Sequence, residues 1–226
     1  MSQSSIRDFL DRSLDPSVRG FLHTPATPNH NALVLTHSAG SNANAPLLIA
    51  LAEAFSATGF TVLRCDLPYR QARSFGPPSP GGAATDRAGL KNAISAMKKF
   101  VTGKIFLGGH SYGGRQSSML CAESVDGDPA VAAVLLLLSY PLHPPRKPEQ
   151  QRTQHLPDLR TPTLFVHGTR DPFGSIAEIE QALKMIPGKT KLLAIEGAGH
   201  DLGFKGKATQ EALPRQILSE FQQMFQ

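Results

Sequence analysis

The sequence predicts an α/β fold, with a mainly parallel central sheet and helices on both of its faces. Short apolar runs typical of buried strands alternate along the chain with amphipathic segments typical of helices. The run at residues 130–138 is apolar at every position, as central parallel strands are. The length of 226 residues suits a single domain, residues 1–226, because undivided α/β domains often reach roughly 200–250 residues.

The first half of the chain begins this alternation. A strand is predicted at residues 32–36, where Ala-Leu-Val-Leu-Thr precedes a polar, glycine-containing turn. Residues 46–58 carry apolar side chains at helical spacing and are followed by a glycine, which predicts a helix and its end. A second strand is predicted at residues 61–66. The four prolines of residues 67–82 predict a loop, and residues 85–100 predict an amphipathic helix.

The middle of the chain continues the same pattern. Residues 104–108 predict a third strand, and residues 113–123 predict a helix that opens with glycines. The apolar run at residues 130–138 predicts the fourth strand. Residues 139–160 are rich in proline, so we expect an irregular connection there.

The last third supplies the remaining elements. Strands are predicted at residues 163–167 and 191–195. Helices are predicted at residues 175–185, where a serine is a good N-cap, and at residues 214–225. With a further edge strand near residues 18–23, the sheet is expected to hold about six to seven strands.

Composition excludes several function classes. The net charge is +5, but Lys and Arg are dispersed, so no nucleic-acid partner is expected. Residues 1–19 lack the apolar core of a signal peptide, and the longest apolar run is too short to span a bilayer, so no membrane role is expected. Cys65 and Cys121 lie in apolar surroundings, which suggests buried thiols and a cytoplasmic location. Metal-ligand and nucleotide-binding motifs are absent from the sequence, so neither a metal nor a cofactor is predicted.

A candidate nucleophile lies at the end of the third predicted strand. Residues 109–113 read Gly-His-Ser-Tyr-Gly and precede a predicted helix. This is the G-x-S-x-G pattern in the strand–turn–helix context that a nucleophile elbow requires. Such a turn is strained, so the positions two before and two after Ser111 need glycine. We therefore predict that Ser111 is a nucleophile whose Oγ is raised above the sheet at its carboxyl edge, where ligands bind in open α/β sheets.

A serine hydroxyl needs a base, and the base needs an acid that fixes its tautomer. Asp171 follows the fifth predicted strand and is the predicted acid. His200 follows the sixth, among small residues, and is the predicted general base. The chain order Ser111, Asp171, His200 is the one expected when this machinery sits on an α/β sheet. Asp201 is the alternative acid, although neighbouring side chains rarely align in this way.

Two backbone N–H groups are needed to stabilise an oxyanion. Tyr112, directly after the nucleophile, supplies one. The second should come from the loop after the first strand, where residues 37–40 read His-Ser-Ala-Gly. We favour the N–H of Ala39, with Ser38 as the alternate.

Five residues around these segments are candidates for substrate contact. Arg115, one turn past the nucleophile, could bind a substrate anion, but anchoring a loop by hydrogen bonds is the favoured interpretation. The others are Ser38, His110, Tyr69 and Pro141. The remaining histidines show no metal-ligand spacing and are expected to be core or solvated residues.

Together these segments resemble the α/β-hydrolase superfamily, over nearly the whole chain from about residue 32 to 225. The stretches that carry the resemblance are residues 37–40, 108–115, 139–145 and 165–174. Within the superfamily the chain is similar to the small lidless group related to dienelactone hydrolases. It also resembles the bacterial relatives of testis-expressed protein 30 and of the hydrolase-like KANSL subunit. The resemblance implies an α/β-hydrolase fold without a lid domain.

Two departures from that group bear on function. The oxyanion loop reads His-Ser-Ala-Gly where many relatives have His-Gly, and the nucleophile is a serine where dienelactone hydrolases use cysteine. The resemblance and the residues together predict a serine hydrolase that cleaves a carboxylester or thioester of a small substrate. The alternative is a catalytically idle interaction module, because the group contains scaffold proteins. We expect an open cleft whose rim, formed by residues 67–82 and 139–160, sets selectivity.

Overall fold

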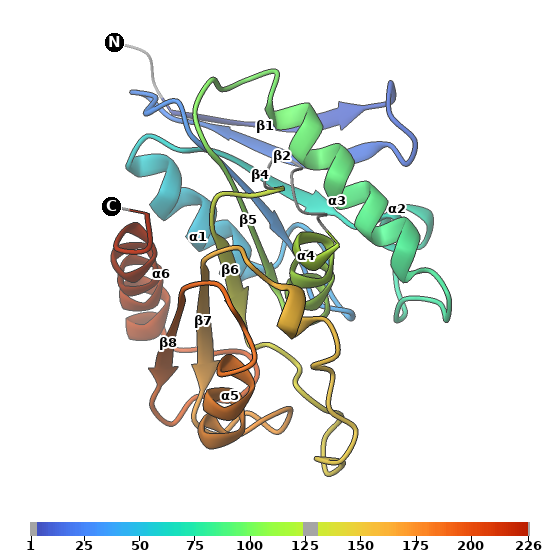
Figure 1. Ribbon diagram of the computed structural model, residues 1–226. Helices are drawn as coiled ribbons and strands as arrows, with labels where there is room; N and C mark the ends of the chain where they lie inside the picture. Colours follow the sequence, from blue (N-terminus) through green and yellow to red (C-terminus); the bar gives the residue numbers. More distant parts are fainter. Residues whose placement is uncertain (1–3, 124–130, 226) are drawn as a thin grey trace.

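The computed structural model describes residues 4–123 and 131–225 and contains a central sheet of eight strands (Figure 1). The strands follow the order β1-β2-β4-β3-β5-β6-β7-β8 across the sheet. Their bounds are β1 Ser5–Asp11, β2 Val18–Thr24, β3 Ala32–Thr36, β4 Thr61–Asp66, β5 Ile105–His110, β6 Leu135–Leu138, β7 Thr163–Gly168 and β8 Thr190–Ile195.

Strands β3 to β8 pair in parallel, so their carboxyl ends lie along one edge of the sheet. Strands β1 and β2 are antiparallel to their neighbours. The six predicted parallel strands are all present, and the mainly parallel sheet is confirmed. β6 is shorter than predicted: it begins at Leu135, and residue 130 lies outside the described residues.

The amino-terminal hairpin differs from the prediction. β2 was expected at an edge, but it lies between β1 and β4. β1 was not predicted, because its only buried side chain is Phe9 and the strand carries three charged residues. An outermost strand covers little of the core, so it leaves no alternating apolar pattern in the sequence.

Helices cover both faces of the sheet, as predicted. α1 (Pro46–Ala57) and α6 (Lys207–Gln222) share one face, where the Phe55 and Phe221 rings lie 5.4 Å apart. α3 (Ala83–Met97), α4 (Tyr112–Ala122) and α5 (Ile176–Leu183) lie on the other (Figure 1). Alternate residues of one strand serve the two cores: Phe106 packs with α1 and α6, and Leu107 packs with α3 and α4.

Two helices depart from their predicted bounds. α6 begins at Lys207, seven residues before the predicted start, because Pro214 lies inside the helix rather than in its first turn. α2 (Pro68–Ala72) occupies part of the predicted loop at residues 67–82, with Pro68 in its first turn. By contrast, Ser175 caps α5 as predicted, since its hydroxyl accepts a hydrogen bond from the Glu178 N–H.

The proline-rich connection from β6 to β7 contains only the short 3₁₀ helix η1 (Leu156–Asp158) and no inserted helical domain. Within the described residues, the fold therefore matches the prediction that no lid covers the carboxyl edge. No helix in that part of the chain is both long and apolar enough to span a bilayer.

Candidate active site

Ser111 lies in the turn between β5 and α4, at the carboxyl edge of the sheet. Its backbone has φ 52° and ψ −114°, a left-handed conformation that is strained for a residue with a Cβ. The turn is held at both ends, because the Ser111 N–H donates to Leu138 O at 2.8 Å and its carbonyl accepts from the Arg115 N–H at 2.9 Å. The Ser111 hydroxyl is thereby fixed above the sheet.

The flanking glycines allow this turn to form. A Cβ on Gly109 would lie 2.5 Å from the Gly113 carbonyl carbon, and a Cβ on Gly113 would lie 2.5 Å from the His37 carbonyl oxygen. Both approaches are closer than real side chains tolerate. The glycine requirement inferred from the sequence therefore has a concrete cause: the start of α4 packs directly on β5 and on the loop that follows β3.

Ser111, His200 and Asp171 form a continuous hydrogen-bonded chain. The Ser111 Oγ lies 2.8 Å from His200 Nε2, and His200 Nδ1 lies 2.8 Å and 3.0 Å from the two carboxylate oxygens of Asp171. Since a carboxylate only accepts hydrogen bonds, Nδ1 carries the proton and Nε2 is left to accept from the serine. Three loops that are far apart in the sequence thus bring these groups together.

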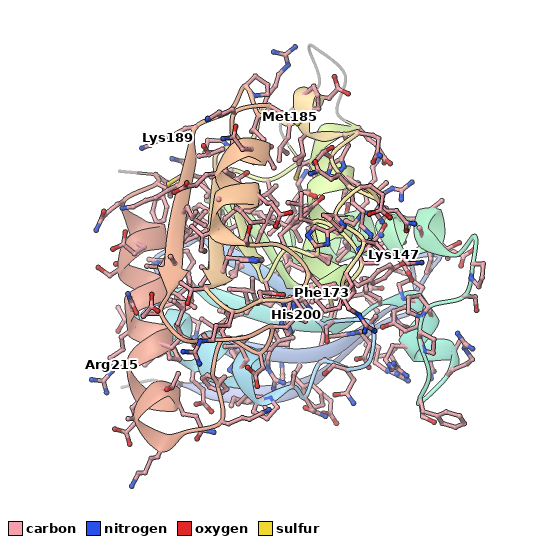
Figure 2. All side chains as sticks on the ribbon, turned by 90° about the horizontal axis from the view of Figure 1, so that it is seen from below. Lys147, Phe173, Met185, Lys189, His200 and Arg215 are labelled. Atoms are coloured by element: carbon pink, nitrogen blue, oxygen red, sulfur yellow. The ribbon has the colours of Figure 1, made fainter. Side chains whose placement is uncertain are left out.

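Asp171 is fixed by its own loop. Its side chain is fully buried, and its Oδ1 accepts a hydrogen bond from the Phe173 N–H at 2.9 Å. The Phe173 ring stacks on the imidazole of His200, with 4.2 Å between ring centroids, and Figure 2 shows the two side by side, seen toward the carboxyl edge of the sheet. The side chain of His200 keeps 24% of its surface exposed, so a small molecule can reach it.

Asp201, the alternative acid, points elsewhere. Its carboxylate pairs with Lys205 Nζ at 3.0 Å and accepts from the Gly203 N–H at 3.0 Å. The structure therefore brings Asp171 to the imidazole of His200 and directs Asp201 toward solvent-exposed partners.

The loop at residues 37–40 is held by side chains from α2. The Tyr69 hydroxyl donates to Ala39 O at 2.8 Å, and Arg70 Nη2 donates to the same oxygen at 3.1 Å. The Arg70 Nε also donates to Ser41 O at 2.7 Å. Tyr69 is almost fully buried, so the structure uses this candidate for substrate contact to position the loop.

His37 also positions this loop, a role that the sequence analysis missed. It is fully buried, and its Nε2 accepts from the Leu67 N–H at 3.1 Å. Its Nδ1 must therefore carry the proton and donate to Ser38 O at 2.9 Å. Burial lowers the pKa of His37, which keeps the ring neutral for this two-sided contact. The sequence signals were its place directly after an apolar strand and its place in the stretch 37–40 that carries the family resemblance.

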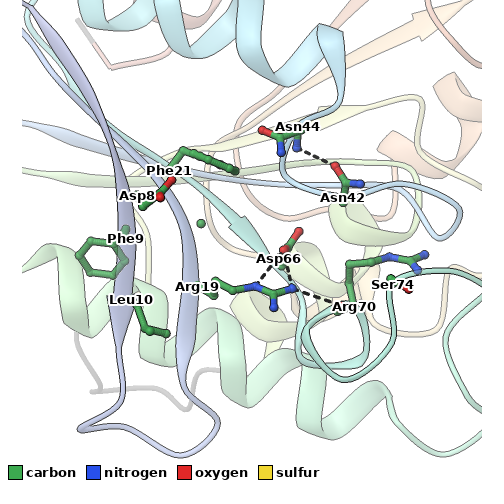
Figure 3. Close-up of a pocket in the computed structure, with 11 residues that line it drawn as sticks. Asp8, Phe9, Leu10, Arg19, Phe21, Asn42, Asn44, Asp66, Arg70 and Ser74 are labelled. Carbon is green, nitrogen blue, oxygen red and sulfur yellow. Dashed lines mark hydrogen bonds and ion pairs between the residues drawn. The ribbon is translucent and has the colours of Figure 1, made fainter.

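A pocket of about 460 Å³ lies behind the same loop (Figure 3). Its lining includes Asp66 and Arg70, and the close-up shows Arg19 bound to the Asp66 carboxylate at 3.0 Å. The Asp66 carboxylate also accepts from the Ala43 N–H at 2.8 Å. Ser111 and its partners are not among the lining residues, so this pocket backs the loop and is separate from the serine.

Two further histidines brace the loops that carry Asp171 and His200. His110 Nε2 donates to the backbone carbonyl of His200 at 2.9 Å. His167, fully buried, donates from Nε2 to Gly174 O at 2.8 Å. The ring of His110, a candidate for substrate contact, is thus used to hold the base's loop. Burial lowers the pKa of both rings, that of His110 to about 4.

The remaining predicted contact residues lie around the serine in different ways. Pro141 is buried, and its carbonyl accepts from Arg152 Nη1 at 3.1 Å. The Ser38 carbonyl takes part in the hydrogen bonds of the 37–40 loop and accepts from the Ser41 N–H at 3.0 Å. Arg115 is half-buried, and its side chain lies beside the Tyr140 hydroxyl of the connection at residues 139–160, so both the anchoring role and the anion-binding role stay predictions. In the described part of the chain, no group of three or more His, Cys, Asp or Glu side chains lies close enough together to hold a metal ion.

The buried histidines predict a loss of stability in mild acid. Burial lowers the pKa of His23, His110 and His155 to about 4. Below the ordinary value near 6.5 the unfolded chain binds protons that the folded chain does not, so the free energy of unfolding should fall as the pH drops from about 6.5 toward 4. Each such group adds up to about 1.4 kcal/mol per pH unit. Urea unfolding at pH 7.5, 6 and 5 measures the slope.

The matched variant for this prediction is His155→Gln, which keeps a donor toward the Ser118 hydroxyl, 2.8 Å from the His155 Nε2. In this variant the free energy of unfolding should change less steeply with pH, by the contribution of one proton. Equal free energies of unfolding at pH 7.5 and 5 in the unsubstituted chain would show that these rings protonate freely in the fold.

Comparisons with known proteins agree with the fold described above. The alpha/beta hydrolase domain family matches residues 29–225. The dienelactone hydrolase of Anabaena variabilis has a similar fold, with a TM-score of 0.77 and 20% identity over 99% of this chain and 100% of that one. The esterase Pf2001 of Pyrococcus furiosus gives 0.73 and 14%, covering 99% and 94%. A lidless a/b serine hydrolase of Xanthomonas campestris gives 0.63 and 15%, covering 98% and 96%.

A curated relative matches only a short stretch. The polyketide synthase ThaQ of Burkholderia thailandensis is 52% identical over 48 residues, which are 21% of this chain, and the chain covers 2% of that protein. The family match, by contrast, spans six of the eight strands, β3 to β8, and the helices from α1 to the end of α6. The chain therefore belongs to the alpha/beta hydrolase domain family.

Proposed function

We propose that this chain is a serine hydrolase that cleaves an ester-type bond, a carboxylester or thioester, of a small substrate. The observation that carries the proposal is the hydrogen-bonded chain from the Ser111 hydroxyl through His200 to Asp171, on a strained turn at the carboxyl edge of the sheet. A surface serine in a glycine turn needs neither an imidazole at 2.8 Å nor a buried carboxylate behind that imidazole. The folds of the similar dienelactone hydrolase and esterase support ester-type bonds in particular.

Acylation follows from the proton positions. The Ser111 Oγ attacks the carbonyl carbon while His200 Nε2 accepts the serine proton. Asp171 keeps the other proton on Nδ1 and stabilises the imidazolium that forms. His200 then gives its proton to the leaving group, and the acyl group stays on Ser111. Because the side chain of His200 is partly exposed, the leaving group has room to depart.

The oxyanion would be held by the backbone N–H groups of Tyr112 and Ala39. The His37 carbonyl lies against Gly113 of α4, so the N–H of Ser38, in the same trans peptide, points away from that helix. The Ser38 carbonyl is occupied by His37 Nδ1 and the Ser41 N–H, on the side away from the Ala39 N–H. These orientations favour Ala39 over Ser38 as the second donor.

Deacylation repeats the chemistry with water. His200 removes a proton from a water molecule, the hydroxide adds to the acyl carbon, and the Ser111 oxygen leaves with the proton returned by His200. Every proton transfer in this cycle uses groups of this chain, so the proposal requires no cofactor. The rim of residues 67–82 and 139–160 would determine which acyl groups reach the serine.

A fluorophosphonate probe tests the proposal. We expect the unsubstituted protein to become labelled on Ser111 and to hydrolyse p-nitrophenyl esters of graded chain length. Ser111→Ala should do neither, because the probe and the esters both need the activated hydroxyl. Labelling no better than that of Ser111→Ala, together with an absence of ester turnover, would reject the proposal and favour the idle interaction module.

A further inference from the structure

Resting on the proposed function, we propose that the ester substrate carries a carboxylate, which the guanidinium groups of Arg115 and Arg152 bind beside Ser111. Arg115 belongs to the first turns of α4, the helix that starts directly after the serine. Side chains on a helix lean toward its amino terminus, so this guanidinium is directed toward the end of α4 where Ser111 lies. A substrate attached at the serine is within the reach of a side chain one turn away.

Arg115 is unusual in how little of its charge is compensated. Its Nε is fully buried and has no hydrogen-bond partner. No carboxylate in the described part of the chain forms an ion pair with Arg115 or Arg152, whereas Arg19 pairs with Asp66 and Arg87 pairs with Glu123. A buried charge without a partner costs free energy, so a site that keeps one is suited to an anionic ligand.

Other enclosed arginines in this protein have partners for their guanidinium groups. The Nε of Arg87 also lacks a hydrogen bond, but it forms an ion pair with the Glu123 carboxylate. Arg70 donates to the carbonyls of Ala39, Ser41, Arg73 and Gly76. Arg64 donates to His23 and to the Ala43 carbonyl, and it also lies over the Phe21 ring. Among the described residues, Arg115 is therefore the arginine whose buried Nε has neither a hydrogen bond nor an ion pair.

Arg152 adds a second positive charge from the connection between β6 and β7. Its backbone is fixed, because its N–H donates to Leu142 O at 2.7 Å and its carbonyl accepts from the Tyr140 hydroxyl at 2.7 Å. Its guanidinium Nη1 donates to the Pro141 carbonyl at 3.1 Å, just after β6, whose Leu138 carbonyl accepts from the Ser111 N–H at 2.8 Å. Burial, followed by the charge of Arg115, lowers the pKa of Arg152. Two such groups on one side of a site favour a carboxylate between them.

The neighbouring side chains leave this charge uncompensated. The Tyr140 hydroxyl lies beside the Arg115 side chain, but burial raises the pKa of Tyr140 to about 12, so it is a neutral phenol. Burial, followed by the Arg115 charge, lowers the pKa of His155 to about 4, so this ring is neutral as well. At neutral pH the cluster of Arg115, Arg152, Tyr140 and His155 therefore carries two positive charges and no negative one.

Two matched pairs of esters test the inference. In the first pair the acyl group differs, aryl hydrogen glutarate against aryl valerate; in the second the leaving group differs, 4-acetoxybenzoate against phenyl acetate. We expect one carboxylate ester to exceed its neutral partner in kcat/KM after allowance for leaving-group reactivity. Arg115→Met should lose about 10- to 100-fold on that ester and stay within about 3-fold on the neutral one.

Three controls make the result specific. Arg115→Lys keeps the charge but loses the two-pronged geometry, so it should restore only part of the preference. Arg215→Gln removes a charge from α6, away from His200 in Figure 2, and should change neither ester. Unchanged fluorophosphonate labelling of Arg115→Met shows that the site has folded.

The outcomes separate this inference from the proposed function. Ser111-dependent hydrolysis of the neutral esters, without a carboxylate preference in either pair or with a preference that Arg115→Met retains, would overturn the inference alone. A protein that neither becomes labelled nor hydrolyses any of the four esters would overturn the proposed function instead.

Discussion

Replacing His200 by alanine is expected to lower kcat for ester hydrolysis by about 10⁴- to 10⁶-fold, with little change in KM. The ring is the only group that accepts the Ser111 proton within hydrogen-bond distance in the described structure, with Nε2 at 2.8 Å from Oγ. Without it the hydroxyl would have to attack with its proton still attached. Steady-state kinetics on a p-nitrophenyl ester, together with single-turnover labelling by the fluorophosphonate probe, measures the loss.

The sharper form of this prediction is the double variant Ser111→Ala/His200→Ala. Since the two groups act as one unit, the double variant should be no slower than either single variant by more than a few-fold. Losses that multiply instead would show that the serine and the histidine contribute independently. Ser111→Ala removes only a hydroxyl from a buried turn, so we expect this variant to fold. The urea midpoint of each variant checks folding.

The sequence predicted those strands and helices whose residue pattern reflects how they are buried in the fold. Parallel strands are buried on both faces, so their apolar runs were visible without the structure. β1 was not visible, because an outermost strand with one buried side chain has no apolar period. Pro214 predicts the start of a helix, since proline usually lies in a first turn, but α6 begins at Lys207 and contains Pro214 in its interior.

The site divides in the same way. Ser111 could be predicted because its turn needs glycines at fixed offsets, which leave a sequence motif. The bracing roles of His37, His110 and His167 could not, because each depends on a carbonyl supplied by the surrounding fold and leaves no spacing rule in the sequence. The orphaned nitrogen of Arg115 is likewise a fact about missing neighbours, which only a packed structure can display.

Replacing Asp171 by asparagine should lower kcat by about 10⁴-fold while leaving the site's shape intact. The reason lies in the contacts of the two carboxylate oxygens. Oδ1 accepts from the Phe173 N–H at 2.9 Å, so the amide oxygen of an asparagine would stay at that position. Its NH₂ group would then occupy the place of Oδ2, 2.8 Å from His200 Nδ1. An NH₂ group donates, so Nδ1 would become the acceptor and the ring proton would move to Nε2, where it blocks transfer from Ser111.

Asp201→Asn is the matched control, because it makes the same chemical change in the neighbouring residue of His200. Its carboxylate pairs with Lys205 and is 41% exposed, so this substitution should change kcat by no more than about two-fold. The two variants decide between the two aspartates that the sequence offered. Comparable losses in both, or a larger loss in Asp201→Asn, would mean that the acid behind His200 during turnover is not Asp171. A large loss confined to Asp171→Asn, with fluorophosphonate labelling slowed in parallel, would place the tautomer of His200 under the control of this buried carboxylate.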